Sequence, residues 1–452
     1  MLVRIMKSRS PRRRRRSGKS SDIRSVSRTT RETQGSGGGS RMTQQRTRLS
    51  PLSSDPIPAV VTRTPIQHPL IYRKRLLDTS EATGGDLVAV YAESQQQPYA
   101  YGLFNPRSEL SLRLLWNGAE FPDERAWERR LKQAVQVRTE VLRLPEECST
   151  WRIIHAEADG LPGLVVDWFD GILSAEAFSL GMYQRGSLLM PMLAQMTSAK
   201  HWMLRPSPQF LAQEGCEPDV LATEGFPDQI VVHEYGTRFR VRFAGSHKTG
   251  FFCDQRENRR KLAEFCADKT VLDLCCYTGG FSVSAALGGA REVTGVDIDD
   301  IPLQVAKENA NLNHASARFV QADIFTWMRE MLRNGRQFDV VILDPPKLIR
   351  SRREIEEGTK KHFAMNRLAM RLVRPGGLLL SCTCAGLLQE AEFTRLLAAA
   401  ARSGGDDFTE MGVSSAPRSF RTIARTGAAP DHPVHSGCPE TEYLNAAWLL
   451  MD

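Results

Sequence analysis

Four acidic residues lie at or near the ends of predicted strands in the second half of the chain: Asp273, Asp297, Asp323 and Asp344. One of them alone could be a structural cap. Four on the same edge of one sheet are hard to explain as caps, because open α/β sheets bind their ligands along that edge. An adenosyl ligand needs carboxylates for its ribose hydroxyls and its adenine amino group. The four residues therefore predict a site for such a ligand.

The last of these acids begins the sequence Asp344-Pro345-Pro346-Lys347. Two consecutive prolines fix the backbone where the chain leaves the strand. We expect them to hold the Asp344 carboxyl rigidly beside the place of group transfer, where it could hydrogen-bond a flat heterocycle. The alternative is an ordinary Pro-Pro that ends a strand.

Cys384 follows the next predicted strand, and Cys382 lies two residues before it. Carbon 5 of cytosine is a poor nucleophile. A thiolate that attacks carbon 6 turns the ring into an enamine that can take a methyl group at carbon 5, and a base must then remove the carbon 5 proton. We expect only one of the two thiols to face the pocket, and we assign the role of nucleophile to Cys384. Most free cysteines are small buried apolar residues, which is what we expect of the others.

These side chains need a scaffold, and residues 270–287 predict its first unit. Residues 271–274 have the length and branching of a buried strand, residues 277–280 form a glycine turn, and residues 281–287 predict a helix. The glycines let a ligand approach the backbone, and the helix start offers free N–H groups. The spacing is not GxGxxG, so the dinucleotide fingerprint is absent.

Further strands and helices alternate after this unit. Strands are predicted at residues 292–296, 317–320, 338–343 and 378–380, and helices at residues 303–312 and 364–372. Repeated βα units predict an α/β domain with a parallel, doubly wound sheet. Two tail strands, at residues 420–426 and 443–451, flank Asp431-His432-Pro433.

The loop that leads into this fold, residues 243–259, is rich in polar, aromatic and glycine residues. A loop of this composition is more than a connector. Asp254, Gln255 and Arg256 precede or begin a predicted helix, so we expect their side chains to face the ligand pocket.

Three regions precede the α/β domain, which we place at residues 241–452. Residues 1–55 are rich in Arg, Ser, Thr and Gly and predict a disordered leader. It could be an RNA-contacting arm, an unstructured leader, a transit peptide, or the product of a start codon assigned too early. Residues 56–120 predict a small β domain, and residues 121–240 a central α+β domain.

In the small β domain, the basic cluster Arg73, Lys74 and Arg75 follows Tyr72. An aromatic residue beside basic residues is typical of a nucleic-acid face, and a solvated strand edge is the alternative.

The positive net charge of the chain comes from its N-terminal segment. Of the net charge of +8, the first 50 residues contribute 13 Arg and 2 Lys against two acidic residues, so the rest of the chain carries −5. The pI of about 9.1 therefore says nothing about a basic folded surface. No apolar run reaches about 18 residues, so no membrane span is expected. Nine scattered cysteines without paired CxxC motifs predict neither a metal site nor a disulfide framework, and favour the cytoplasm.

Five motifs in fixed order resemble a known family: HKTGFFCDQRENR, VLDLCCYTGGF, VTGVDID, VILDPPK and SCTCAGL. The chain is similar to the bacterial class I, S-adenosylmethionine-dependent methyltransferases with an N-terminal PUA domain, which form 5-methylcytosine in 23S ribosomal RNA. The resemblance covers roughly residues 58–452, and HPLIYRKRL and HAEADGLPGLVVD match its PUA and central domains. It implies a Rossmann-like methyltransferase domain after a small β-barrel PUA domain and an α+β domain. The Arg-rich leader is not part of the pattern, and the family needs only one of the two cysteines.

The resemblance implies S-adenosylmethionine as the cofactor and large-subunit ribosomal RNA as the partner, with a homodimer as a further option. Its cofactor site falls on Phe252, Asp254, Gln255, Arg256, Asp273, Tyr277, Thr278, Gly279, Asp297, Ile298, Asp323 and Asp344. Cys384 and Asp344 would be catalytic, and the RNA would contact Lys347 together with the basic cluster of the β domain.

Two other functions stay open on the residues. A methyltransferase that acts on an exocyclic base amine would need the Asp-Pro-Pro sequence but no cysteine. An RNA-binding assembly factor could keep the cofactor fold without turnover.

Overall fold

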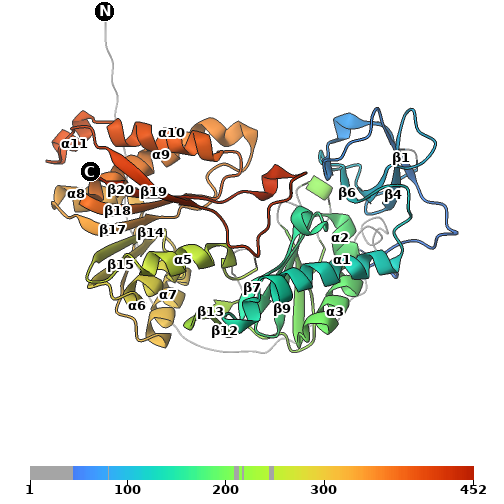
Figure 1. The fold of residues 1–452 in the computed structure, drawn as a ribbon, viewed down its shortest axis with the longest axis horizontal. Helices are drawn as coiled ribbons and strands as arrows, with labels where there is room; N and C mark the ends of the chain where they lie inside the picture. The colour runs from blue at the N-terminus through green and yellow to red at the C-terminus, as the bar shows by residue number, and fades with distance from the viewer. Residues whose placement is uncertain (1–43, 80, 208–212, 216–217, 244–248) are drawn as a thin grey trace, which may run out of the picture.

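The structure is a computed structural model that describes residues 44–452 except residues 80, 208–212, 216–217 and 244–248. Three folded parts follow one another from the blue end to the red end of the chain in Figure 1. Most of the predicted leader and residues 244–248 of the predicted cofactor loop lie outside the described residues. The prediction of a disordered leader up to residue 55 was too long, because Leu49 and Ser50 are buried and Ser50 Oγ accepts a hydrogen bond from Trp127 Nε1.

The first part is a six-stranded sheet in the order β2-β6-β5-β4-β1-β3. Its strands are β1 (Ala59–Thr62), β2 (Leu70–Ile71), β3 (Leu76–Asp78), β4 (Leu87–Ala92), β5 (Ala100–Phe104) and β6 (Leu112–Asn117). The two edge strands, β2 and β3, are joined only by Tyr72 and the short 3-10 helix η1 (Arg73–Arg75). Such a short link brings the two edges together, so the sheet curls toward a barrel around a buried apolar core.

The second part is a five-stranded sheet in the order β11-β10-β9-β8-β7 with helices against it. Its elements are β7 (Thr150–His155), β8 (Leu164–Phe169), β9 (Ile172–Ala177), β10 (His201–Pro206), β11 (Leu221–Ala222), α1 (Glu124–Gln136), α2 (Leu180–Gln184) and α3 (Gly186–Thr197). A separate hairpin, β12 (Gln229–Glu234) and β13 (Thr237–Arg242), leads to the third part. Arg259 in the third part forms a buried ion pair with Glu234 of this hairpin.

The third part is a seven-stranded sheet in the order β16-β15-β14-β17-β18-β20-β19. Its strands are β14 (Thr270–Leu274), β15 (Glu292–Asp297), β16 (Arg318–Gln321), β17 (Phe338–Leu343), β18 (Val373–Thr383), β19 (Phe420–Thr426) and β20 (Asn445–Met451). The first five are parallel, whereas β20 runs antiparallel to both its neighbours. The prediction of a parallel, doubly wound sheet is thus confirmed for β14 to β18. It does not hold for the tail strand β20, which pairs antiparallel with β18 and β19.

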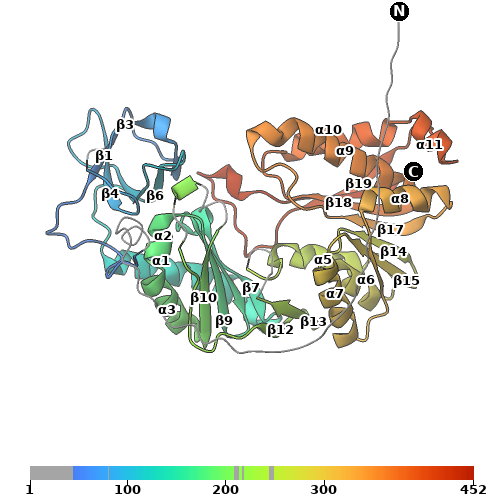
Figure 2. The same ribbon diagram turned by 180° about the vertical axis from the view of Figure 1, so that it is seen from behind.

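Helices cover both faces of this sheet (Figure 2). They are α5 (Arg256–Ala263), α6 (Gly280–Leu287), α7 (Asp300–Leu312), α8 (Ile324–Arg333), α9 (Ile355–Leu372), α10 (Glu390–Arg402) and α11 (Asp406–Glu410). Strand order reverses at β14, which lies between β15 and β17. The carboxyl ends of these strands therefore flank the crevice in which open α/β sheets bind ligands. Within the described residues, no helix is both long enough and apolar enough to cross a membrane.

Candidate active site

The glycine turn follows β14 at the reversal point of the sheet. Cys275, Tyr277 and Gly279 all have positive φ angles, of 62°, 48° and 76°. This sharp turn points the start of α6 toward the crevice. A Cβ atom on Gly279 would lie 2.9 Å from Ala306 Cβ, so only glycine fits there. The predicted turn residue Thr278 is buried, and its carbonyl oxygen accepts a hydrogen bond from Asn309 Nδ2.

Asp273, inside β14, holds the start of α6. Its Oδ2 accepts hydrogen bonds from Ser282 N and Ser282 Oγ, at 3.0 and 2.7 Å. Its Oδ1 is buried and has no hydrogen-bond partner among the described residues. Burial outweighs the bonds from Ser282 and raises the pKa of Asp273 to about 7. A buried carboxyl oxygen without a partner is costly, and a bound ligand that donated to it would remove that cost.

Two further acids close β15 and β16. Asp297 accepts a hydrogen bond from Tyr277 N at 2.9 Å and one from Asp299 N at 3.0 Å. The side chain of Ile298, next to it, is 66% exposed. Asp323 is the N-cap of α8 and accepts from Thr326 N at 2.9 Å, which is the structural role weighed for such acids.

Asp344 directly follows β17 and is half-buried. Its Oδ2 accepts a hydrogen bond from Gln255 Nε2 at 3.0 Å. Burial, followed by the carboxylates of Asp254 and Asp273, raises the pKa of Asp344 to about 7. Asp254 is buried beside this group, and its Oδ2 accepts from the hydroxyl of Tyr443 at 2.6 Å. Two predicted cofactor residues, Asp254 and Gln255, thus meet Asp344.

Phe252 contacts the glycine turn through its ring. The rings of Phe252 and Tyr277 pack edge to face, with centroids 5.1 Å apart. The loop before α5 and the turn after β14 therefore meet at the carboxyl edge of the sheet, as their sequences predicted.

Arg256 does not join this group. Its side chain is fully buried, and its two terminal nitrogens donate to Asp431 at 3.1 and 2.8 Å. The prediction that it faces the ligand pocket was wrong. The reason is a carboxylate 175 positions away in the sequence, which satisfies the guanidinium on the other side of the loop.

The two thiols near the end of β18 differ in depth. Cys382 lies within the strand and is fully buried in the core, where burial and the Asp344 carboxylate raise its pKa well above the usual thiol range. Cys384 lies one residue beyond β18 and is half-buried, and its Sγ is 4.0 Å from the carbonyl oxygen of Pro345. Residues two apart within a strand face the same side of the sheet. Cys384 lies beyond the end of β18, so this rule does not place its thiol beside that of Cys382.

Comparison with known sequences assigns this architecture to a family. The model of the S-adenosylmethionine-dependent methyltransferases matches residues 152–405, and that of a PUA-like domain matches residues 65–117. The chain belongs to the S-adenosylmethionine-dependent methyltransferases. The "Ribosomal RNA large subunit methyltransferase I" of Aliivibrio fischeri is 33% identical over 386 residues, which cover 84% of this methyltransferase and 94% of that protein. The protein of the same name from Photobacterium profundum is 32% identical over the same shares.

Solved structures share the fold of the methyltransferase. The crystal structure of SMU.776, a methyltransferase complexed with SAH, superposes with a TM-score of 0.72 at 17% identity, over 87% of this chain and 100% of that one. A SAM-dependent methyltransferase from Streptococcus mutans gives a TM-score of 0.70 at the same identity and coverage.

The residues at the sheet edge fit an adenosyl cofactor. Asp273 offers a buried oxygen that lacks a partner, and the Gly279 turn has no room for a side chain. Asp297 lies at the end of the neighbouring strand, where carboxylates of such folds meet ribose hydroxyls.

The predicted RNA-contacting residues of the methyltransferase lie on its surface. Lys347 is exposed after the two prolines. Arg73, Lys74 and Arg75 form the exposed helix η1, next to Tyr72, whose side chain is 54% exposed. Arg73 N donates to Glu109 O and thereby fixes the backbone at the start of this cluster.

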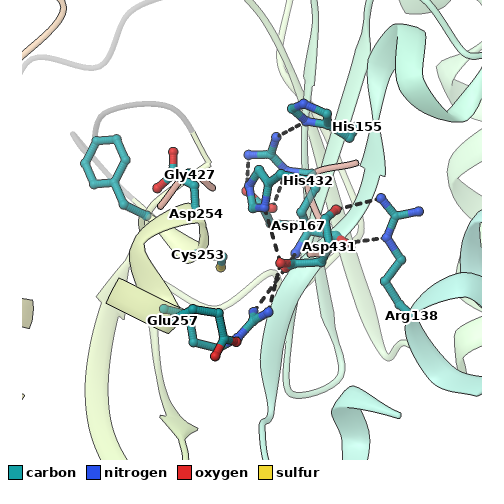
Figure 3. Close-up of polar contacts among 12 residues, drawn as sticks. Arg138, His155, Asp167, Cys253, Asp254, Glu257, Gly427, Asp431 and His432 are labelled. Carbon is teal, nitrogen blue, oxygen red and sulfur yellow. Dashed lines mark hydrogen bonds and ion pairs between the residues drawn. The ribbon is translucent and has the colours of Figure 1, made fainter. Parts of the chain in front are cut away.

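A buried polar cluster that sequence analysis missed ties the tail to the central sheet (Figure 3). We call Arg138, Arg152, Arg256, Asp431 and His432 the Asp431 cluster. Asp431 accepts from Arg152 N and both terminal nitrogens of Arg256, and its carbonyl oxygen accepts from Arg138. Burial opposes ionisation, but His432 and Arg256 outweigh it and hold the pKa of Asp431 well below its usual range. The only sequence signal was the polar Asp431-His432-Pro433 between the two tail strands.

A second missed residue lies behind the thiols. His362 of α9 is buried, and its Nε2 is 3.2 Å from Thr383 Oγ1, which in turn accepts from Ala385 N. Burial lowers the pKa of His362 to about 4, so the ring is neutral near pH 7. His362 and Thr383 therefore fix the backbone on both sides of Cys384.

Proposed function

We propose that this methyltransferase forms 5-methylcytosine in large-subunit ribosomal RNA through a covalent adduct on Cys384. The observation that carries the proposal is the half-buried Cys384 thiol, whose Sγ lies 4.0 Å from the carbonyl oxygen of Pro345 in the Asp-Pro-Pro turn. The relatives named as ribosomal RNA large subunit methyltransferases, and the PUA-like domain, support RNA as the substrate.

The cofactor would lie along the carboxyl edge of the sheet. Asp273 would accept a hydrogen bond from it through Oδ1, and Asp297 would accept from its ribose. Phe252 and Tyr277 would border its amino-acid part, together with Asp254 and Gln255. When bound, S-adenosylmethionine would supply an electrophilic methyl group.

The protein would activate the cytosine through two groups. Cys384 Sγ forms a bond to carbon 6, and the electron pair of the carbon 5–carbon 6 double bond becomes available at carbon 5. Asp344, with a pKa of about 7, is partly protonated near neutral pH and can donate a hydrogen bond to ring nitrogen 3. That hydrogen bond draws electrons from the ring and favours attack at carbon 6. After methylation the carbon 5 proton leaves to a base, the double bond re-forms, and the Sγ–carbon 6 bond breaks.

The target base must leave its stack to reach a site of this depth. The exposed η1 cluster and Lys347 would hold the surrounding RNA backbone, since lysine and arginine contacts to phosphates position a nucleic acid without specifying its sequence.

Transfer of a radiolabelled methyl group to unmodified 23S ribosomal RNA, followed by nucleoside analysis, tests the proposal. We expect the label in 5-methylcytidine. Label in an N-methylated nucleoside would show that the Asp-Pro-Pro turn orients an exocyclic amine instead. Cofactor binding without transfer to any ribosomal RNA would favour an assembly factor.

A further inference from the structure

Three side chains from distant parts of the chain meet where the tail touches the small β sheet. They are His68, which precedes β2, and Cys438 and Glu440, which lie at and in the short helix η7 (Pro439–Thr441) of the tail. His68 Nε2 is 3.1 Å and Cys438 Sγ 3.6 Å from Glu440 Oε2, and the three atoms lie within 4.8 Å of one another. Within the part of the chain that the structure describes, no other group of histidine, cysteine and carboxylate side chains is as compact in this sense.

Two of the three distances between the ligand atoms are close to the edges of a tetrahedral metal site. Zinc binds sulfur at about 2.3 Å and nitrogen or oxygen at about 2.0–2.2 Å, so its ligand atoms lie roughly 3.3–3.7 Å apart at tetrahedral angles. The two measured edges, at 3.1 and 3.6 Å, need shifts of only a few tenths of an ångström.

Backbone contacts already hold the three groups in place. Leu70 N donates to His68 Nδ1 at 3.1 Å, and the carbonyl oxygen of Leu70 lies 3.2 Å from the same atom. These contacts fix the ring with Nε2 directed at Glu440 Oε2. Cys438 N donates to His435 O, and Cys438 O accepts from Thr441 Oγ1. The cysteine and the carboxylate therefore lie on one hydrogen-bonded turn.

The chemistry of the three ligands selects the ion. An imidazole, a thiolate and a carboxylate together suit Zn²⁺, whereas Mg²⁺ and Ca²⁺ prefer oxygen ligands alone. One thiolate and one carboxylate balance a charge of +2. The Glu440 side chain is 66% exposed, so water can reach a fourth position.

We propose that His68, Cys438 and Glu440 bind one Zn²⁺ ion that joins the PUA-like sheet to the tail of the methyltransferase domain. The tail segment between β19 and β20 also contains Asp431, which binds Arg256, and Tyr443, which binds Asp254 at the cofactor edge. The ion thus fixes the RNA-facing sheet to the segment that supports the active site. Figure 1 shows this red segment reaching across to the other two parts.

The full-length protein, stripped with EDTA, provides the test by titration with Co²⁺ and Zn²⁺. We expect one metal ion per chain, thiolate-to-cobalt charge-transfer absorption from a single cysteine, and displacement of Co²⁺ by Zn²⁺. Cys438→Ser should abolish that absorption, and His68→Ala and Glu440→Gln should each weaken Zn²⁺ binding by at least about tenfold. His435→Ala removes an exposed histidine of the same turn and should bind Zn²⁺ as the unchanged protein does.

Circular dichroism checks that each variant folds, and Zn²⁺ should raise the thermal midpoint of the unchanged protein but not of Cys438→Ser. No stoichiometric binding would overturn the proposal and leave Glu440 as an acceptor of two hydrogen bonds. Thiolate-to-cobalt absorption that persists in Cys438→Ser would also overturn the proposal, because the thiolate bound to Co²⁺ would then belong to another cysteine. These readings do not involve methyl transfer, so their failure is separate from failure of the proposed function.

Discussion

Two sets of buried or half-buried carboxyl groups flank the segment from Asp254 to Arg256, and they differ in their hydrogen-bond donors. At the edge of the seven-stranded sheet, Asp273 has one oxygen without a partner, and the pKa values of Asp273 and Asp344 are raised to about 7. In the Asp431 cluster, the Asp431 carboxylate accepts from the Arg256 guanidinium and the Arg152 backbone N–H, and its pKa is held below its usual range.

The contrast separates support from function. A buried carboxylate with its full set of donors stabilises the fold and has no capacity left for a ligand. A buried carboxyl that lacks donors destabilises the protein until something binds to it, which is typical of functional sites. Arg256, assigned to the cofactor by sequence, belongs to the saturated set.

The largest effect on activity is expected at the two thiols. Cys384 lies at the proposed site and Cys382 in the core, so they too separate function from support of the fold. Cys384→Ala should lower the rate of methyl transfer at least about a thousandfold, because it removes the nucleophile, while cofactor affinity stays unchanged. Cys382→Ala is the matched control in the core and should retain transfer. Labelled methyl transfer and calorimetric cofactor binding measure the two quantities, and full activity of Cys384→Ala would refute a covalent role for this residue.

Asp431→Ala should lower the free energy of unfolding by about 3–5 kcal/mol, because it leaves the fully buried Arg256 without its carboxylate. Urea denaturation measures the loss. Asp323→Ala, which removes only a helix cap, should cost about 1 kcal/mol. Equal losses in the two variants would remove the distinction between a saturated cluster and an ordinary cap.

Asp273→Asn should weaken cofactor binding about 10- to 100-fold, which corresponds to one hydrogen bond with a charged partner. The variant keeps an oxygen that can accept from Ser282, so its free energy of unfolding should fall by less than about 1 kcal/mol. Isothermal calorimetry with S-adenosylmethionine gives the first quantity and denaturation the second. Unchanged affinity would place the cofactor elsewhere.

The pH dependence of stability should have opposite signs in the two sets. Between about pH 4 and pH 7, folded Asp273 holds a proton that the unfolded chain has released, so this group makes stability fall as the pH rises. Asp273→Asn should therefore gain stability relative to the unchanged protein across that range, starting from its small deficit near pH 4. The lowered pKa of Asp431 makes its contribution present above about pH 4 and lost as the pH falls further. Denaturation of the ligand-free protein and of the two variants, Asp273→Asn and Asp431→Ala, from pH 3 to pH 8 tests both signs. If the free energy of unfolding of all three proteins changed with pH in the same way, both assignments would be contradicted.

Sequence predicted the elements with strong local signals. The strands at residues 338–343 and 420–426 appear as β17 and β19, with the same ends. The glycines after Pro375 were predicted as a turn before a strand. β18 begins earlier, at Val373, but Gly376 has a φ of 75° and the register with β17 shifts between Phe338 and Val340, so the glycines form an irregular bulge within the strand. Helix α9 begins at Ile355, nine residues before the predicted start, in a charged segment with little apolar periodicity.

Long-range pairing could not be predicted in the same way. Asp431 binds groups 175 and 279 positions away, and Glu440 lies 372 positions from His68. No local pattern encodes such contacts, so sequence placed Arg256 at the cofactor and did not group His68 with Glu440. The acids at the strand ends were predictable because parallel strands place their carboxyl ends together whatever the distance along the chain.

The most direct test is whether RNA with 5-fluorocytidine in place of cytidine traps the methyltransferase. Fluorine at carbon 5 cannot leave as a proton does, so an adduct formed by thiol attack and methylation would persist. We expect a denaturation-resistant protein–RNA complex that depends on S-adenosylmethionine, with the nucleotide attached to Cys384 by peptide mass spectrometry. Absence of the complex despite methylation of ordinary RNA, or attachment to Cys382, would contradict the role of the thiol at the sheet edge.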